Sequence, residues 1–249
     1  MERVLPDDIE ATVEKWRRLL DLEVDVDVRI SDEQTPPQCL AGEVPPRIVL
    51  PPDSPEPPIA HEMGHLALAK KYDLCFGQIE FDWRGGEDDF FEDQIEIASS
   101  CCDLFVDRII FDAKPDIVDT YLEYEMPVLT YFHERLEEIP KNESLLRGGL
   151  YIVVALITVK LENSGKEISS VMKDILATVE RIRSPAEAKT IIRLFDLYKQ
   201  LPPLPDDRFE AVGLYREATQ KTSRILGFRV PYLVLSADKD RHLWSKTNK

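Results

Sequence analysis

The stretch IAHEMGHLAL, residues 59–68, places two histidines four positions apart within an otherwise apolar segment. In an α-helix, positions i and i+4 lie one turn apart on one face, so the imidazoles of His61 and His65 can approach a single divalent ion. Glu62 lies on the flank of that face, within reach of a water molecule beside the ion. The H-E-x-x-H spacing therefore predicts a zinc site held by His61 and His65, with Glu62 as the catalytic base.

The sequence before this motif predicts one helix and a small sheet. Apolar residues recur at helical spacing over residues 7–21, and alternation of β-branched and charged residues predicts a strand over residues 24–30. A short strand is expected over residues 39–44 and another over residues 47–50. Prolines on both sides of residues 47–50 favour an edge strand. The H-E-x-x-H helix is expected to run from about residue 58 to residue 72.

The sequence after the motif is predicted to be mainly helical. Glycines and acidic residues over residues 73–89 indicate a loop, and a long helix is expected over residues 90–111. Residues 228–235 are predicted to be a strand or an extended arm. The predicted fold class is α+β and predominantly helical, with a metal-binding catalytic core over residues 1–112 and a helical C-terminal region over residues 113–249. Further helices are expected over residues 116–138, 143–163, 166–182, 185–200 and 207–226.

Composition limits the classes of partner. The 249 residues carry 31 Lys and Arg against 47 Asp and Glu, which gives a formal net charge of −16. Such an acidic surface repels phosphate backbones, so nucleic acid and anionic membranes are not expected as partners. The N-terminus has no signal-peptide pattern, and the four cysteines form no disulfide framework. A cytoplasmic, reduced protein is therefore expected.

The order of helix, small sheet and H-E-x-x-H helix over residues 7–72 resembles that of the zincin metallopeptidases. Two histidines leave a zinc site incomplete, because a catalytic site needs a third protein ligand and an open position. Metzincins place a glycine and a third histidine after the motif, but Leu68 and Lys71 occupy those positions here. A carboxylate is therefore the expected third ligand, so the pattern resembles that of gluzincins and of zincins with an aspartate ligand.

The predicted helix over residues 90–111 offers two carboxylates as the third ligand. The residues from Glu96 to Ser100 resemble the gluzincin pattern, in which a glutamate ligand precedes a small residue and a polar one. The residues from Asp103 to Asp107 resemble a D-x-x-V-D pattern of other zincin-like families. In both patterns the residue four positions after the ligand orients a ligating histidine through a hydrogen bond. Asp103 and Glu96 both remain candidates for the ligand.

The resemblance implies a zinc-dependent metallopeptidase that cleaves a peptide or protein substrate. The candidates for a hydrogen-bond donor to the developing oxyanion are Tyr131, His133, Arg135 and Tyr151. The predicted edge strand at residues 47–50 is expected to bind an extended substrate by strand addition. Two alternatives stay open: a zincin-like regulatory protein that acts on one specific partner, and a zinc-binding scaffold without catalysis.

Overall fold

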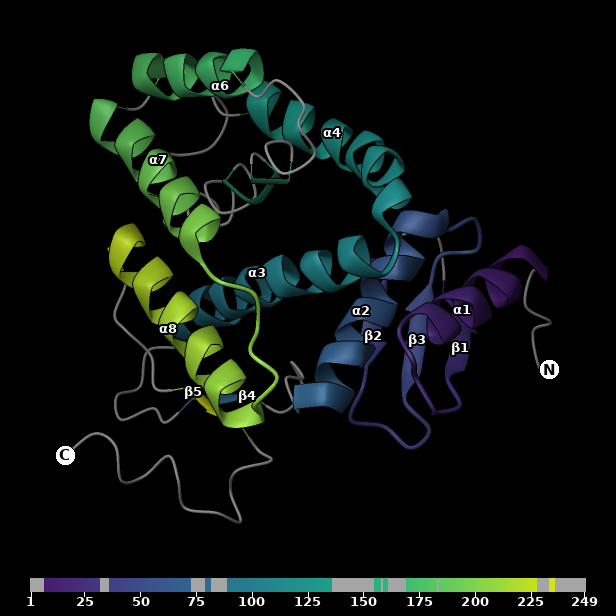
Figure 1. Ribbon diagram of the computed structural model, residues 1–249. Helices are drawn as coiled ribbons and strands as arrows, with labels where there is room; N and C mark the ends of the chain where they lie inside the picture. Colours follow the sequence, from purple (N-terminus) through teal and green to yellow (C-terminus); the bar gives the residue numbers. More distant parts are fainter. Residues whose placement is uncertain are drawn as a thin grey trace.

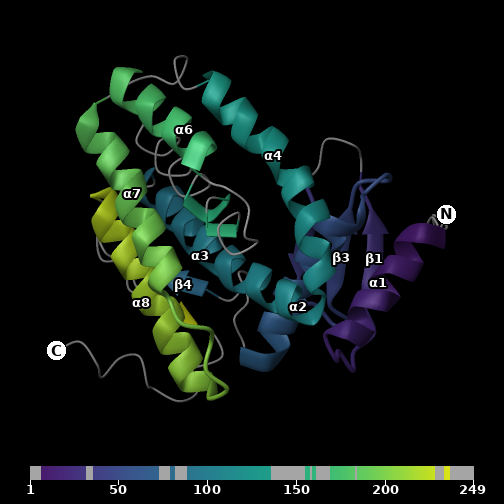
Figure 2. The same ribbon diagram turned by 45° about the horizontal axis from the view of Figure 1, so that its top comes forward.

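The structure is a computed structural model, drawn in Figure 1, and it is mostly helical with a small three-stranded mixed sheet. This agrees with the predicted α+β, predominantly helical class. In Figures 1 and 2 the sheet lies at one end of the molecule and most of the helices lie at the other. The residues described are 7–31, 36–72, 79–81, 89–135, 155–157, 159–160, 169–182, 184–227 and 233–235.

The three-stranded sheet has the order β1-β3-β2, with β1 at Asp27–Ile30, β2 at Gln38–Leu40 and β3 at Arg47–Leu50. Strand β3 runs parallel to β1 and antiparallel to β2. The prediction of an edge strand over residues 47–50 is therefore wrong, because β3 is central. The neighbouring prolines lie just outside β3, so every residue of the strand keeps its amide hydrogen for pairing. These prolines therefore end β3 without interrupting its pairing with β1 and β2.

The first turn of α2 (Glu56–Tyr72) is anchored by one carboxylate. Glu56 Oε1 accepts hydrogen bonds from Lys15 Nζ at 2.7 Å and from the indole of Trp16 at 3.1 Å, both on α1 (Asp7–Leu19). Lys114 Nζ, just after α3 (Asp89–Ala113), donates to the same oxygen at 3.2 Å. The start of the H-E-x-x-H helix is therefore fixed to α1 and to the end of α3.

Helices α2 and α3 approach closely at Gly64. A Cβ atom added to Gly64 would lie 2.7 Å from Cγ1 of Val106 and 3.2 Å from two side-chain atoms of Ile110. Only a residue without a side chain fits this contact. The third position between the two histidines is thus small for a packing reason, and it lets α3 lie directly against the histidine face of α2.

The C-terminal helices form an arc that returns to α3 (Figures 1 and 2). A short 3-10 turn at Pro115–Ile117 leads into α4 (Val118–Arg135), and α6 (Ser169–Ile182), α7 (Pro185–Gln200) and α8 (Arg208–Leu226) follow. The side chain of Arg108 on α3 donates to the carbonyl oxygens of Leu201 and Pro202 at 2.8 and 2.7 Å. The end of α7 is thereby joined to α3.

Helix α8 lies along α3 through a contact that includes hydroxyl groups. Tyr215 Oη donates to the carbonyl oxygen of Ala98 at 2.9 Å. The hydroxyls of Tyr198 and Thr222 lie 3.1 Å apart, and the thiol of Cys101 on α3 lies 3.5 Å from the Thr222 hydroxyl. All these side chains are buried. The side of α3 that faces α8 is therefore held by directional polar contacts as well as by apolar packing.

Two short strands form a second sheet, with β4 (Ile79–Phe81) antiparallel to β5 (Leu233–Leu235). The prediction of a continuous loop over residues 73–89 is therefore wrong at β4, whereas β5 falls within the segment predicted as strand or arm. A three-residue strand pairs with a segment about 150 residues away, so its local sequence carries little signal. The predicted helix over residues 143–163 is described only at residues 155–157 and 159–160, which are helical.

The buried apolar side chains form one cluster that draws on both predicted regions, including Trp16, Phe105 and Tyr215. The predicted boundary after residue 112 falls one residue before the end of α3. The division into a core and a C-terminal region stays a prediction.

Gly64→Ala is expected to destabilise the fold by about 1–3 kcal/mol, because the added methyl group overpacks the contact with Val106. Gly213→Ala on α8 is the matched control, since no atom lies within 4 Å of the position its Cβ would take. That change should stabilise the protein by about 0.5–1 kcal/mol through helix propensity. Urea unfolding of both variants measures the difference, and equal stabilisation by both would show that the close contact is absent.

Candidate metal centre

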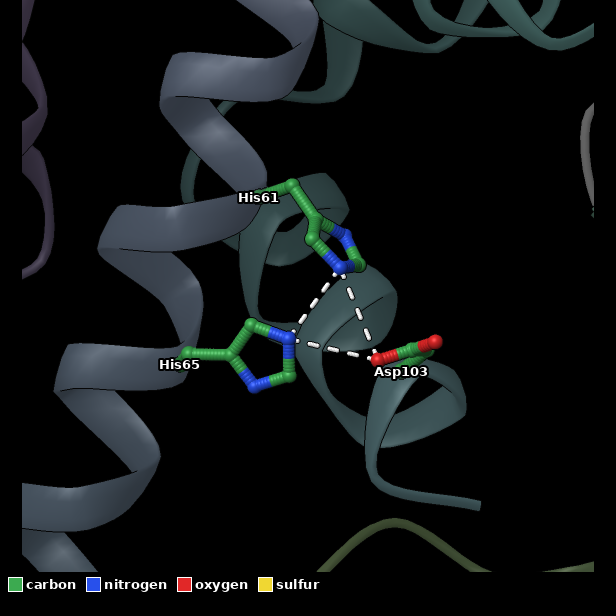
Figure 3. A group of neighbouring side chains, drawn as sticks. All are labelled: His61, His65 and Asp103. Carbon is green, nitrogen blue, oxygen red and sulfur yellow. Dashed lines mark hydrogen bonds and ion pairs between the residues drawn. The ribbon is translucent and has the colours of Figure 1, made fainter. Parts of the chain in front are cut away.

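Helices α2 and α3 bring three potential ligands together (Figure 3). Nε2 of His61 and Nε2 of His65 lie 3.1 Å apart, and Oδ1 of Asp103 lies 3.5 Å and 3.2 Å from them. Ligands of a tetrahedral zinc ion at 2.0–2.1 Å are separated from one another by about 3.3 Å. The three atoms therefore have the spacing that a tetrahedral ion requires, and nitrogen and carboxylate donors suit zinc.

The surroundings of these groups favour a cation. Burial opposes protonation of His61, but Asp103 and Asp107 outweigh it and raise the pKa of this imidazole well above its ordinary value. Burial also disfavours the Asp103 carboxylate, yet hydrogen bonds with both histidines lower its pKa. The site therefore attracts positive charge, which a proton on His61 can supply and which a divalent ion would supply in its place.

Glu62, the predicted catalytic base, is buried on the same turn of α2, with a relative exposure of 6%. Burial raises its pKa above the ordinary glutamate value, while the charges of His61 and His65 oppose that change. A carboxyl group with a raised pKa can take up a proton nearer to neutral pH than an exposed glutamate can. Its environment thus suits the role that the sequence predicts.

The other side of His61 is held by a tyrosine. Nδ1 of His61 lies 2.7 Å from the hydroxyl of Tyr121, and this hydroxyl donates to Oδ1 of Asp107 at 2.8 Å. Nδ1 lies 3.7 Å from the same carboxylate oxygen, which is too long for a hydrogen bond. Asp107 was predicted to orient a histidine directly, but Tyr121 bridges the two residues. Tyr121 is not predictable from the local sequence, because only the packing of α4 brings it to the site.

A buried lysine pairs with Asp107 on the side away from His61. Nζ of Lys160 lies 2.6 Å from Oδ2 of Asp107 and 2.5 Å from Oε1 of Glu125. Burial opposes ionisation of both partners, but the Lys160 charge holds the pKa of Asp107 below its ordinary value, and the two carboxylates raise the pKa of Lys160. Lys160 is not predictable from the local sequence either, since a single lysine in an apolar stretch gives no sign of its partner.

His65 has a different neighbour, because its Nδ1 lies 3.7 Å from Sγ of the buried Cys102. Glu96, the other candidate for the third ligand, lies on α3, but its side chain is outside the described residues. The side chains of Tyr131, His133 and Arg135 and the whole of Tyr151 are also outside them. The predicted oxyanion donors therefore stay predictions.

In comparisons with known proteins, the chain matches no family model, no curated protein and no solved structure. Within the part of the chain that the structure describes, no helix is both long and apolar enough to cross a membrane.

The wild-type protein is expected to bind one zinc ion per chain, and His61→Ala, His65→Ala and Asp103→Ala should each abolish stoichiometric binding. Each change removes one of the three donors that lie 3.1–3.5 Å from one another. Glu96→Ala should retain the ion, since Asp103 already completes the triad. Metal analysis after dialysis measures the stoichiometry. Loss of zinc in Glu96→Ala with retention in Asp103→Ala would assign the ligand to Glu96.

Zinc affinity is expected to fall as the pH is lowered. His61 must lose a proton to bind the ion, and its pKa is raised well above the ordinary histidine value. Below that pKa the affinity should decrease about tenfold for each pH unit, because one proton competes for Nε2. Chelator competition from about pH 8 to about pH 5 measures this slope. A constant affinity over that range would contradict the predicted protonation of His61.

Proposed function

We propose that this chain is a zinc-dependent metallopeptidase of the zincin type, in which His61, His65 and Asp103 hold the ion. The observation that carries the proposal is the convergence of two Nε2 atoms and one carboxylate oxygen at 3.1–3.5 Å beside the buried Glu62. Three protein ligands leave a fourth position for water or substrate, which distinguishes catalytic zinc sites from closed structural ones.

Zinc would act as a Lewis acid that polarises the scissile carbonyl and acidifies water. Glu62 takes one proton from the attacking water, whose oxygen bonds to the carbonyl carbon of the peptide. The same carboxyl group then gives this proton to the leaving amine nitrogen as the C–N bond breaks. Burial supports this role, because it raises the pKa of Glu62 toward the range in which the group can both accept and release a proton.

The arrangement of elements supports the zincin type as well. Helix α1, the mixed sheet, α2 with its two histidines and α3 with its carboxylate follow one another in the order that the resemblance implies. The ligand triad formed with Asp103 is similar to that of zincins with an aspartate ligand. Lys114 and Glu56 join the end of α3 to the start of α2, so the two ligand-bearing helices form one unit.

The substrate would bind along a strand other than the one predicted. Strand β3 is paired on both sides, so it has no free edge for strand addition. Among the described strands, β2 is the antiparallel edge, and it packs against α2. Gln38 and Leu40 are exposed on β2, while Cys39 packs toward the core. A peptide added to β2 would be extended, with alternate side chains facing the protein.

Glu62→Gln is expected to lower kcat/KM for peptide cleavage by at least about 10²-fold, because the amide cannot take the proton from water. Zinc content should stay at the wild-type level, since Glu62 is not among the ligands. Glu180→Gln, at an exposed position on α6, is the control and should leave both quantities unchanged. The assay uses an unfolded protein and a library of short fluorogenic peptides with the zinc-loaded full chain.

Equal activity of the wild-type and Glu62→Gln proteins would overturn the peptidase proposal. Cleavage of a single co-purifying protein, with no cleavage of the library, would favour the regulatory alternative. Zinc binding without any peptide cleavage would favour the other alternative, a zinc-binding scaffold without catalysis.

A further inference from the structure

A continuous chain of polar groups extends from His61 away from the candidate metal centre into the interior. It runs from Nδ1 of His61 to the hydroxyl of Tyr121, then to Asp107 and then to Lys160. The side chain of Asp107 is 2% exposed and that of Lys160 is 6% exposed. Buried charges are costly unless each is paired, so such a chain needs a reason for its presence.

The positions of the hydrogen atoms in this series of side chains follow from the number of donors and acceptors that each group has. Tyr121 has a single hydroxyl hydrogen, and its oxygen lies within hydrogen-bond distance of both His61 and Asp107. The Asp107 carboxylate, paired with the Lys160 ammonium at 2.6 Å, can only accept. The tyrosine hydrogen must therefore point to Asp107, and the tyrosine oxygen must accept a hydrogen from Nδ1 of His61. The proton of neutral His61 is thus on Nδ1, and Nε2 keeps its lone pair.

Lys160 makes this assignment possible. Asp107 on α3 and Glu125 on α4 are two carboxylates on one ammonium group, with Nζ at 2.6 and 2.5 Å. The same Nζ lies 5.0 Å from the centre of the Tyr121 ring. Tyr121 and Glu125 are one turn apart on α4, so a single face of this helix supplies both contacts. Without the ammonium, the buried Asp107 would lose the cation that holds its carboxylate in place beside Tyr121.

We propose that Tyr121 and Lys160 are positioning residues of the metal centre, which hold His61 with its proton on Nδ1 and its Nε2 lone pair directed at His65 and Asp103. This inference rests on the proposed zinc site, and it adds residues from the C-terminal helical region to the determinants of metal affinity. Neither residue touches the ion or the substrate in this role.

Tyr121→Phe tests the inference with little change in shape. Zinc affinity, measured by chelator competition, should weaken about 10–100-fold, because the ring of His61 loses the acceptor that fixes its orientation. Tyr124→Phe, at an exposed tyrosine on the same helix, should leave the affinity within about threefold of wild type. In the zinc-loaded wild type, NMR should show the Nδ1 proton of His61 as a slowly exchanging, hydrogen-bonded signal. Tyr121→Phe should remove that signal.

Lys160→Met tests the charged end of this series of polar groups, and Lys221→Met is its control. Lys221 pairs with Glu217 at 2.6 Å on α8, where both side chains are exposed, so its removal costs an ion pair without touching the residues around His61. Zinc affinity should fall at least about tenfold in Lys160→Met and stay near wild type in Lys221→Met. Should Lys160→Met fail to fold, Tyr121→Phe alone decides the outcome.

The possible results separate this inference from the proposed function. Wild-type zinc affinity and an unchanged Nδ1 signal in Tyr121→Phe would overturn the positioning role while leaving the metal site intact. An equal loss of affinity in Tyr124→Phe would also overturn it. A wild-type protein that binds no zinc would refute the metal site and the positioning role together. Zinc binding without peptide cleavage would reject the peptidase proposal, and the affinities of the variants would still decide the positioning role.

Discussion

The close contact between α2 and α3 at Gly64 is the constraint on which the candidate site depends. Two histidines on one helix can face a carboxylate on another only if the helix axes come near enough for short side chains to meet. Asp103 has a shorter side chain than glutamate, so it requires a closer approach than Glu96 would need from the same helix. The absence of a side chain at position 64 permits that approach, since any Cβ would meet Val106. Packing and ligand geometry are therefore set by the same contact.

Charge explains the arrangement of Asp107, Tyr121 and Lys160 behind the three candidate ligands. Asp103 and Asp107 surround His61 with more negative charge than the imidazole alone can balance. The ammonium of Lys160 supplies positive charge on one side of that ring, and a divalent ion held by the triad would supply it on the other. Tyr121 separates the two sides, because its hydroxyl carries a hydrogen bond between them without carrying a charge. This order of charged and neutral groups lets a strongly polar cluster exist beside an apolar core.

Local patterns predicted the part of the site that lies on single helices. The spacing of His61 and His65 determines their common face, and α2 and α3 formed close to the predicted bounds. The choice between Asp103 and Glu96 could not be made, since both were expected on one helix and the choice depends on how that helix crosses α2. Tyr121 and Lys160 were not predicted, because they reach the site only through the packing of α4 and residues 155–160. The position of β3 in the sheet was missed because its prolines mark the strand ends and not its partners.

The hydroxyl contacts between α3 and α8 have a consequence for how exactly the three candidate ligands are positioned. Helices joined by apolar side chains alone can turn about their axes or slide by fractions of an ångström at little energetic cost. A hydrogen bond from Tyr215 to the Ala98 carbonyl and the Thr222 contact with Cys101 resist both movements, since they depend on direction as well as distance. The rotation of α3 about its axis, and with it the direction of the Asp103 carboxylate, is thereby restrained by residues that lie more than 110 positions further along the chain.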